Sequence, residues 1–180
     1  MAMTLVTTNT SSNAANSAFT GIHNTYKLFI FKFINVNPAT DRTHFTFNGS
    51  DDASSWSYDI VKTTTWWKAD GSEDGNTGTM AYHESQHLAQ STAYQNISSY
   101  AGGGSDECGA GDFFLFNPSS TTYIKHFYST FQFYSDQDPE QRAANSFTAG
   151  YFNTTAAITA IDFKMASGNM DAVIKMYGVG

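Results

Sequence analysis

The chain has 180 residues, of which 16% are aromatic, and a formal net charge of −7 from 9 basic and 16 acidic residues. This length suits one domain, and the single cysteine excludes an intrachain disulfide. Because no cluster of Lys or Arg offsets the negative charge, binding to nucleic acid or to an anionic membrane surface is disfavoured. Phe and Tyr favour strands, and the intervening Ser, Thr, Asn and Gly favour turns, so the composition indicates an all-β fold.

The N-terminal segment differs in composition from the rest of the chain. Residues 1–25 are rich in Thr, Asn, Ser and Ala and lack the positive and apolar parts of a signal peptide. We expect an arm that, if ordered, packs on the domain's own sheet edge or on a neighbouring subunit. Residues 26–180 are then the sandwich domain, and they contain no run of about 18 apolar residues that would predict insertion into a membrane.

The strands alternate with turn signals along the whole domain. The strands that we predict are residues 26–34, 42–48, 56–62, 63–68, 113–116, 123–134, 147–152, 158–165 and 172–179. Both faces of 26–34 are apolar, which indicates a central strand covered on both sides. Long polar loops are expected at 69–78, 100–112 and 135–146, and a short helix near 84–96. The pattern of about nine to ten antiparallel strands is typical of a single β-sandwich of the jelly-roll or lectin-like kind.

The segment HESQH matches a motif of zinc peptidases through His83, Glu84 and His87. Such a site needs both histidines one turn apart on a long amphipathic helix, and a third ligand from elsewhere. The surrounding residues are mostly polar, and no further ligand motif follows. We therefore expect a chance match, with no catalytic residues, no metal and no cofactor, and keep a zinc metalloprotease as a remote alternative.

Two other segments hold weaker candidates. Asp70, Glu73 and Asp74 resemble the start of a calcium-binding loop, but Ala81 stands where an EF-hand needs a bidentate Glu. A solvated hairpin tip is the expected structure. Cys108 has acidic neighbours that disfavour a reactive thiolate, so we expect an ordinary thiol.

Tryptophan offers the best candidate for ligand binding. Trp66 and Trp67 are adjacent, so on a strand they face opposite sides, one in the core and one exposed. An exposed Trp near Asp70 and Asp74 would suit a glycan platform. Packing of the same side chain against another subunit is an equal alternative.

Three segments, residues 26–47, 115–129 and 150–180, resemble a group of tailed-phage proteins, particularly from marine viruses. The resemblance implies a virion structural component with a jelly-roll or lectin-like domain, made in the bacterial cytoplasm. It implies a non-enzymatic role in capsid decoration or in a tail or fibre assembly. The expected partners are other virion proteins and further copies of the chain, with a trimer as one form. A glycan-binding module for host attachment is the alternative.

Overall fold

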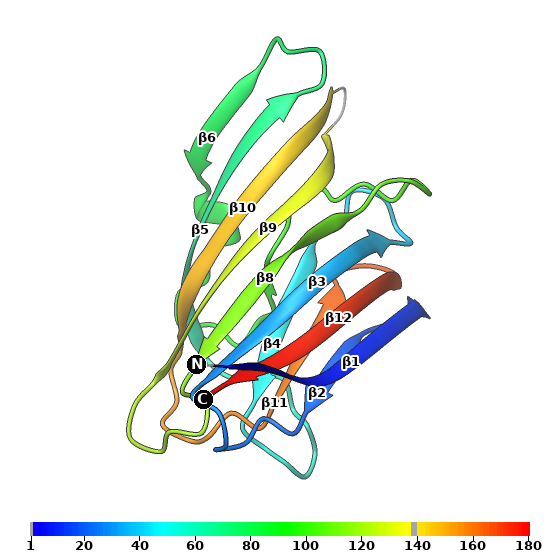
Figure 1. Ribbon diagram of the computed structural model, residues 1–180. Coiled ribbons are helices and arrows are strands. Elements are labelled where there is room, and N and C mark those ends of the chain that lie inside the picture. The colour runs from blue at the N-terminus through cyan, green and yellow to red at the C-terminus, as the bar shows by residue number, and fades with distance from the viewer. Residues whose placement is uncertain (1, 138–139) are drawn as a thin grey trace.

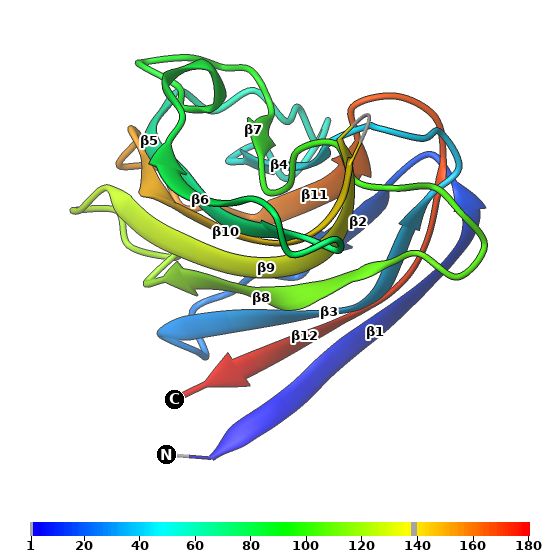
Figure 2. The same ribbon diagram turned by 90° about the horizontal axis from the view of Figure 1, so that it is seen from above.

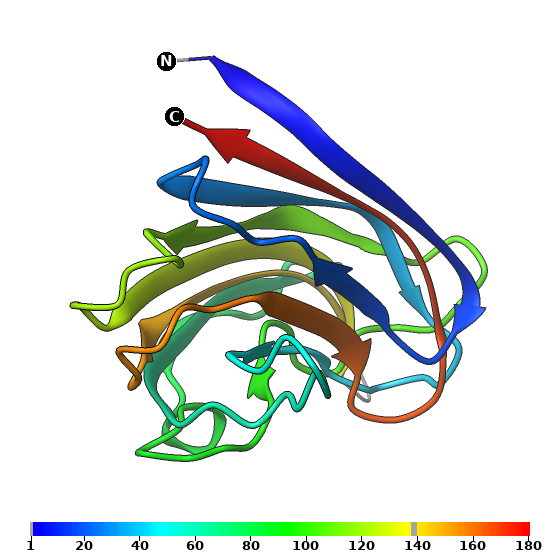
Figure 3. The ribbon, with the colours of Figure 1, turned by 90° about the horizontal axis from the view of Figure 1, so that it is seen from below.

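The computed structural model describes residues 2–137 and 140–180 and confirms an all-β sandwich of two antiparallel sheets (Figure 1). The eight-stranded sheet comprises, in spatial order, β1 (Met3–Ala14), β12 (Met170–Val179), β3 (Leu28–Pro38), β8 (Gly109–Phe116), β9 (Lys125–Gln137), β10 (Glu140–Phe152), β5 (Lys62–Ser72) and β6 (Gly78–Tyr82). The four-stranded sheet comprises β2 (Ser17–Thr20), β11 (Ala160–Met165), β4 (Phe45–Ser50) and β7 (Gln95–Asn96). The large sheet curls around the small one (Figures 2 and 3).

Several predicted boundaries differ from the structure. The described residues form 12 strands rather than nine or ten, because residues 1–25 contribute β1 and β2 and residues 78–96 contribute β6 and β7, whereas the strand expected at 56–62 is absent. The helix expected near 84–96 is absent, and a single 3₁₀ turn, Glu84–Gln86, stands there without a side-chain cap or a buried residue. A helix needs an apolar face to pack, and this polar segment has none.

The polar segments around β5 and β10 are strands rather than loops. Residues 56–61 are not a strand, and β5 extends through 69–72, where a loop was expected. Of the predicted loop 135–146, residues 138 and 139 lie outside the described residues, and the remainder belongs to β9 and β10. These polar strand segments lie where the large sheet extends beyond the small one. Neither of their faces is apolar there, so the sequence shows no alternation of apolar and polar residues that would predict a strand.

The core fills the space between the sheets with phenylalanine rings. On β3, Phe29, Phe31 and Phe33 point inward and are 0–2% exposed. Phe163 of β11 lies opposite, with five rings at centroid distances of 5.0–6.1 Å. Each favourable aromatic pair contributes about 0.5–1.5 kcal/mol beyond the burial of its area. Phe163 is therefore the aromatic centre of the sandwich.

The other face of the large sheet has no second layer among the described residues. β3 is central, between β12 and β8, as predicted. Its outward residues Leu28, Ile30 and Ile34 are apolar, whereas Lys32 between them forms an ion pair with Asp112 of β8 at 2.7 Å. Ile34 is 37% exposed, so the expected cover on both sides is wrong for the described chain. The apolar outward residues of β3 belong to a larger surface that continues across the sheet.

Candidate functional site

An aromatic ladder crosses four strands on the outer face of the large sheet. It consists of Phe114 and Phe116 of β8, Tyr128 of β9, Phe147 of β10 and Trp67 of β5. Centroid distances are 4.5 Å for Phe114–Tyr128, 5.9 Å for Phe116–Tyr128, 6.0 Å for Tyr128–Phe147 and 5.3 Å for Phe147–Trp67, with interplanar angles of 17–30°. The five rings therefore form one continuous stack.

Strand register creates this ladder. Phe114 lies opposite Tyr128, and Phe147 lies opposite Trp67, so their side chains leave the sheet on the same face. Because each ring covers part of its neighbour, the ladder presents mainly ring edges to solvent. Phe116 at one end is 37% exposed. Beyond Trp67 at the other end, Met80 of β6 is 75% exposed, which extends the apolar surface to the sheet edge.

A hollow interrupts the outer face beside the ladder. It has a volume of about 470 Å³ and lies over Ala149 of β10, where the small side chain leaves the sheet uncovered. His126 and Tyr151 border it, with their rings edge to face at 6.0 Å, and Thr63 and Thr65 border it from β5. Aromatic walls and polar groups therefore meet here around an open space on the outer face.

The two adjacent tryptophans face opposite sides of β5. Trp66 points inward and is 0% exposed, whereas Trp67 lies in the ladder. Trp66 meets the ring of His83 edge to face at 5.2 Å. Its indole Nε1 and the Nε2 of His83 are both buried, and neither has a hydrogen-bond partner among the described residues. Trp66 is thus part of the interior and cannot contribute to a surface platform.

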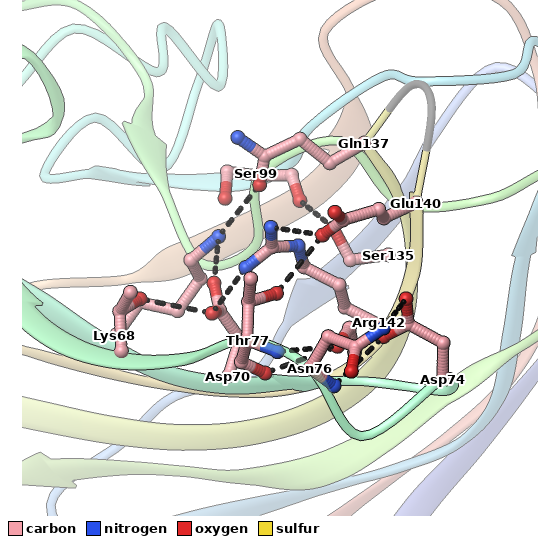
Figure 4. A network of polar contacts seen from close by, with 12 residues as sticks. Lys68, Asp70, Asp74, Asn76, Thr77, Ser99, Ser135, Gln137, Glu140 and Arg142 are labelled. Atoms are coloured by element: carbon pink, nitrogen blue, oxygen red, sulfur yellow. Dashed lines mark hydrogen bonds and ion pairs between the residues drawn. The ribbon is translucent and has the colours of Figure 1, made fainter.

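Asp70 also points away from the ladder, into a network of ion pairs on the concave side of β5 and β10 (Figure 4). Its carboxylate lies 2.7 Å from Nζ of Lys68 and 2.9 Å from Nη1 of Arg142, whose Nη2 lies 2.6 Å from Glu140. Burial acts to raise the pKa of Asp70, but hydrogen bonds from Lys68, Thr79 and Arg142 outweigh it and hold the pKa below its usual value. This carboxylate stays charged and joins β5 to β10.

Asp74 is occupied by its own turn. Its carboxylate accepts hydrogen bonds from the Ser72 hydroxyl at 2.6 Å and from the backbone and side-chain amides of Asn76 at 2.9 and 2.8 Å. These hydrogen bonds lower the pKa of Asp74, and the bond from Ser72 has the largest effect. Of the glycan-platform candidates Trp66, Trp67, Asp70 and Asp74, Trp66 and Asp70 face the interior, Asp74 lies in its own exposed turn, and Trp67 stands in the ladder.

The histidines of HESQH diverge. His83 faces Trp66, whereas His87 stacks on Tyr82 at 5.7 Å, and its Nδ1 shares a 3.0 Å hydrogen bond with the Tyr82 hydroxyl. Burial lowers the pKa of His83, and the nearby charge of Lys68 lowers it further. Across residues 2–137 and 140–180, no group of three His, Cys, Asp or Glu side chains could hold a metal ion. The motif thus lacks both the helix and the converging ligands of a zinc peptidase.

Sequence reasoning missed the aromatic ladder, apart from Trp67. The sequence does contain a signal for the ladder. The strands that carry Phe114 and Tyr128 have aromatic residues at both odd and even positions, whereas a strand with one core face needs them at alternate positions only. Among the described residues, no helix is long and apolar enough to cross a membrane. Neither a protein-family model, nor a curated protein, nor a solved structure matches the chain.

Proposed function

We propose that this protein is a non-enzymatic structural component that docks, through the aromatic ladder, onto another protein of a larger assembly. One observation carries the proposal: a continuous aromatic stack remains on the outer face of a sheet whose opposite face already supplies the core. Contiguous exposed apolar surface is rare on soluble monomers and marks interaction sites. Aromatic residues are also enriched at the centres of protein interfaces.

The shape of the ladder favours a protein partner. Its rings cover one another's faces, and a sugar that stacks on an aromatic ring needs an open face. Ring edges on a gently curved sheet instead suit an apolar protein surface. The five ladder residues are uncharged, so a partner buries them without the desolvation cost of an ionic group.

The assembly that we propose is the surface of a tailed-phage virion, as capsid decoration or as a tail or fibre module. The resemblance of residues 26–47, 115–129 and 150–180 to phage structural proteins supports this assignment. Its partners would be other virion proteins and further copies of the chain. Virion surfaces repeat one contact many times, so a modest apolar interface in each copy is sufficient for stable attachment.

Particle analysis tests this proposal. Cryo-electron microscopy of virions that carry this chain is expected to show it at repeated positions, with the ladder against a neighbouring protein. A Trp67→Ser, Tyr128→Ser variant is expected to fold and to be lost from particles. Gln132→Ser, which changes an exposed residue on the outer face of β9, is the matched control and should be retained. Purified virions without the chain would refute the virion assignment.

The hollow over Ala149 favours a second candidate, a glycan-binding module. His126, Tyr151 and Thr63 supply hydrogen-bonding groups beside aromatic walls, as a small polar ligand requires. A glycan array is expected to give signals that disappear in Ala149→Leu, which fills the hollow, and persist in Gln132→Ser. If the folded protein gave no signal on the glycan array, this candidate would be contradicted and the docking proposal would be unaffected.

A further inference from the structure

The four sheet edges differ greatly in length. The large sheet ends at β1 and β6, and the small sheet ends at β2 and β7. β6, β2 and β7 have 5, 4 and 2 residues, whereas β1 has 12. An edge strand presents unpaired backbone N–H and C=O groups, and natural proteins keep such edges short or block them. β1 is thus the one long edge among the described strands.

The regular central part of β1, residues 7–11, lacks the usual blocking features. The whole strand, MTLVTTNTSSNA, contains no charged residue and no proline, and charges and proline are the common means of preventing edge-to-edge pairing. On one side it pairs with β12, and no described strand pairs with its other side. The chain as a whole has a net charge of −7, so an uncharged edge lets two copies approach without like charges in contact.

The edge is already held in a fixed position. The Asn9 side chain donates hydrogen bonds to the Ala18 carbonyl at 2.9 Å and to the Ser17 hydroxyl at 3.3 Å, which fastens β1 to β2. Asn13 N–H donates to the Asp171 carboxylate at 2.6 Å. Because β1 is ordered before any partner arrives, association loses little further backbone entropy.

We propose that β1 pairs with β1 of a second copy of this chain, antiparallel and around a two-fold axis at Asn9. The register of β1 with β12 shifts at Leu5/Thr7 and at Ser11/Ala14, so the regular part of the edge is 7–11. A two-fold axis at its centre places Thr7 opposite Ser11 and Thr8 opposite Thr10 of the other copy. Every cross-strand pair beside the axis then joins two hydroxyl side chains, a favourable combination in antiparallel sheets.

The consequence is one sheet that continues through both copies. Thr8 and Thr10 are exposed and lie on the outer face, as their pairing with outward Lys175 and Val173 indicates. The two aromatic ladders would then face the same side of the joined sheet, which doubles the surface for docking. Because a two-fold contact of this kind uses the same edge of both copies, it closes at two and leaves no free β1 edge.

Cysteine pairing tests the register. In a Cys108→Ser background, which removes the native exposed thiol, Thr8→Cys protein is mixed with Thr10→Cys protein under mild oxidation. Directly opposed side chains have Cβ atoms about 4.5–5.5 Å apart, and diagonal ones are farther. The mixture is expected to form disulfide-linked dimers at least about fivefold faster than either protein alone, since each alone offers only the diagonal pair. Equal rates in the three samples would overturn the proposed register.

Sedimentation equilibrium tests the pairing itself. The wild-type chain is expected to be a dimer, and Thr8→Lys, Thr10→Lys to be a folded monomer, because four lysines would meet around the axis. Ala110→Lys, Gln132→Lys adds the same charge on exposed outer-face positions of β8 and β9 and should remain a dimer. A monomeric or trimeric wild-type protein, or a lysine variant of β1 that still dimerises, would overturn the proposal. None of these outcomes depends on whether the ladder docks.

Discussion

The two faces of the large sheet are built from the same residue types and perform different tasks. The inner face packs Phe31, Phe33 and Phe113 against Phe163 at interplanar angles of 60–78° and leaves these rings almost unexposed. The outer face stacks its rings side by side and leaves them half-buried. Aromatic content alone therefore does not distinguish a core from a binding surface. What distinguishes them is whether a second layer covers the rings.

The same contrast applies to polar residues. Lys68 and Asp70 lie on the inner side of β5, nearly unexposed, and each has a charged or hydrogen-bonding partner. The threonines on the outer side, Thr63 and Thr65, border an open hollow. Buried charges are retained in proteins when they are paired, so the inner network is structural, and the accessible groups of the outer face are the ones available to a ligand or partner.

The largest test of this comparison removes one ring from the core between the sheets and one from the outer face of the large sheet. Phe163→Ala is expected to lower the free energy of unfolding by about 3–5 kcal/mol, because a buried Phe leaves a cavity among five other rings. Phe116→Ala, at the exposed end of the ladder, is the control and should lower it by about 1 kcal/mol or less. Urea denaturation measures both. Equal losses would mean that the outer ladder is as much a part of the core as Phe163.

The second test breaks the inner ion pairs. Asp70→Asn keeps the shape of the side chain but leaves Lys68 and Arg142 without their shared carboxylate, so a loss of about 1.5–3 kcal/mol in unfolding free energy is expected. Asp74→Asn is the control, since Asp74 lies in an exposed turn, and its effect should be smaller. A larger effect at Asp74 than at Asp70 in urea denaturation would show that the turn matters more than the network.

The sequence predicted features that depend on a single strand, but not features that depend on how distant strands are paired. The apolar residues of 26–34 predicted a central strand but not which of its faces the core covers, and the adjacency of Trp66 and Trp67 predicted that they separate. β1 has no apolar period, and it is a strand because β12 offers it backbone partners. The ladder and the ion-pair network depend on register between distant strands, such as Phe147 opposite Trp67. Single-strand patterns do not contain that information.

The third test uses a buried lysine on the inner face. Lys62 is 0% exposed, and its Nζ donates to the carbonyls of Ile60 and Ala93 at 3.0 and 2.6 Å. Burial lowers its pKa to about 7, partly opposed by the charge of Asp59. Between this value and about 10.5, the unfolded chain binds a proton that the folded chain does not. The free energy of unfolding is therefore expected to rise with pH between these two pKa values. The contribution of Lys62 to stability is lowest at pH values below this window.

Lys62→Met provides the comparison that isolates this effect. From pH 7 to pH 8, the wild type is expected to gain about 1 kcal/mol more in unfolding free energy than Lys62→Met, since one titrating group contributes at most about 1.4 kcal/mol per pH unit. Urea denaturation at the two pH values measures the difference. Parallel pH profiles for the two proteins would mean that Lys62 keeps its ordinary pKa in the folded chain.

The smallest effect on stability is expected on the outer face, at Met80. This side chain is 75% exposed at the edge of the ladder, so Met80→Ser should change the unfolding free energy by no more than about 0.5 kcal/mol. Its incorporation into particles should nevertheless fall, because the serine shortens the apolar surface that the ladder offers to a partner. Met176→Ser makes the same exchange on the inner face, where Met176 is 0% exposed, and should lower stability by several times as much. If Met80→Ser left incorporation unchanged, the docking surface would have to end at Trp67.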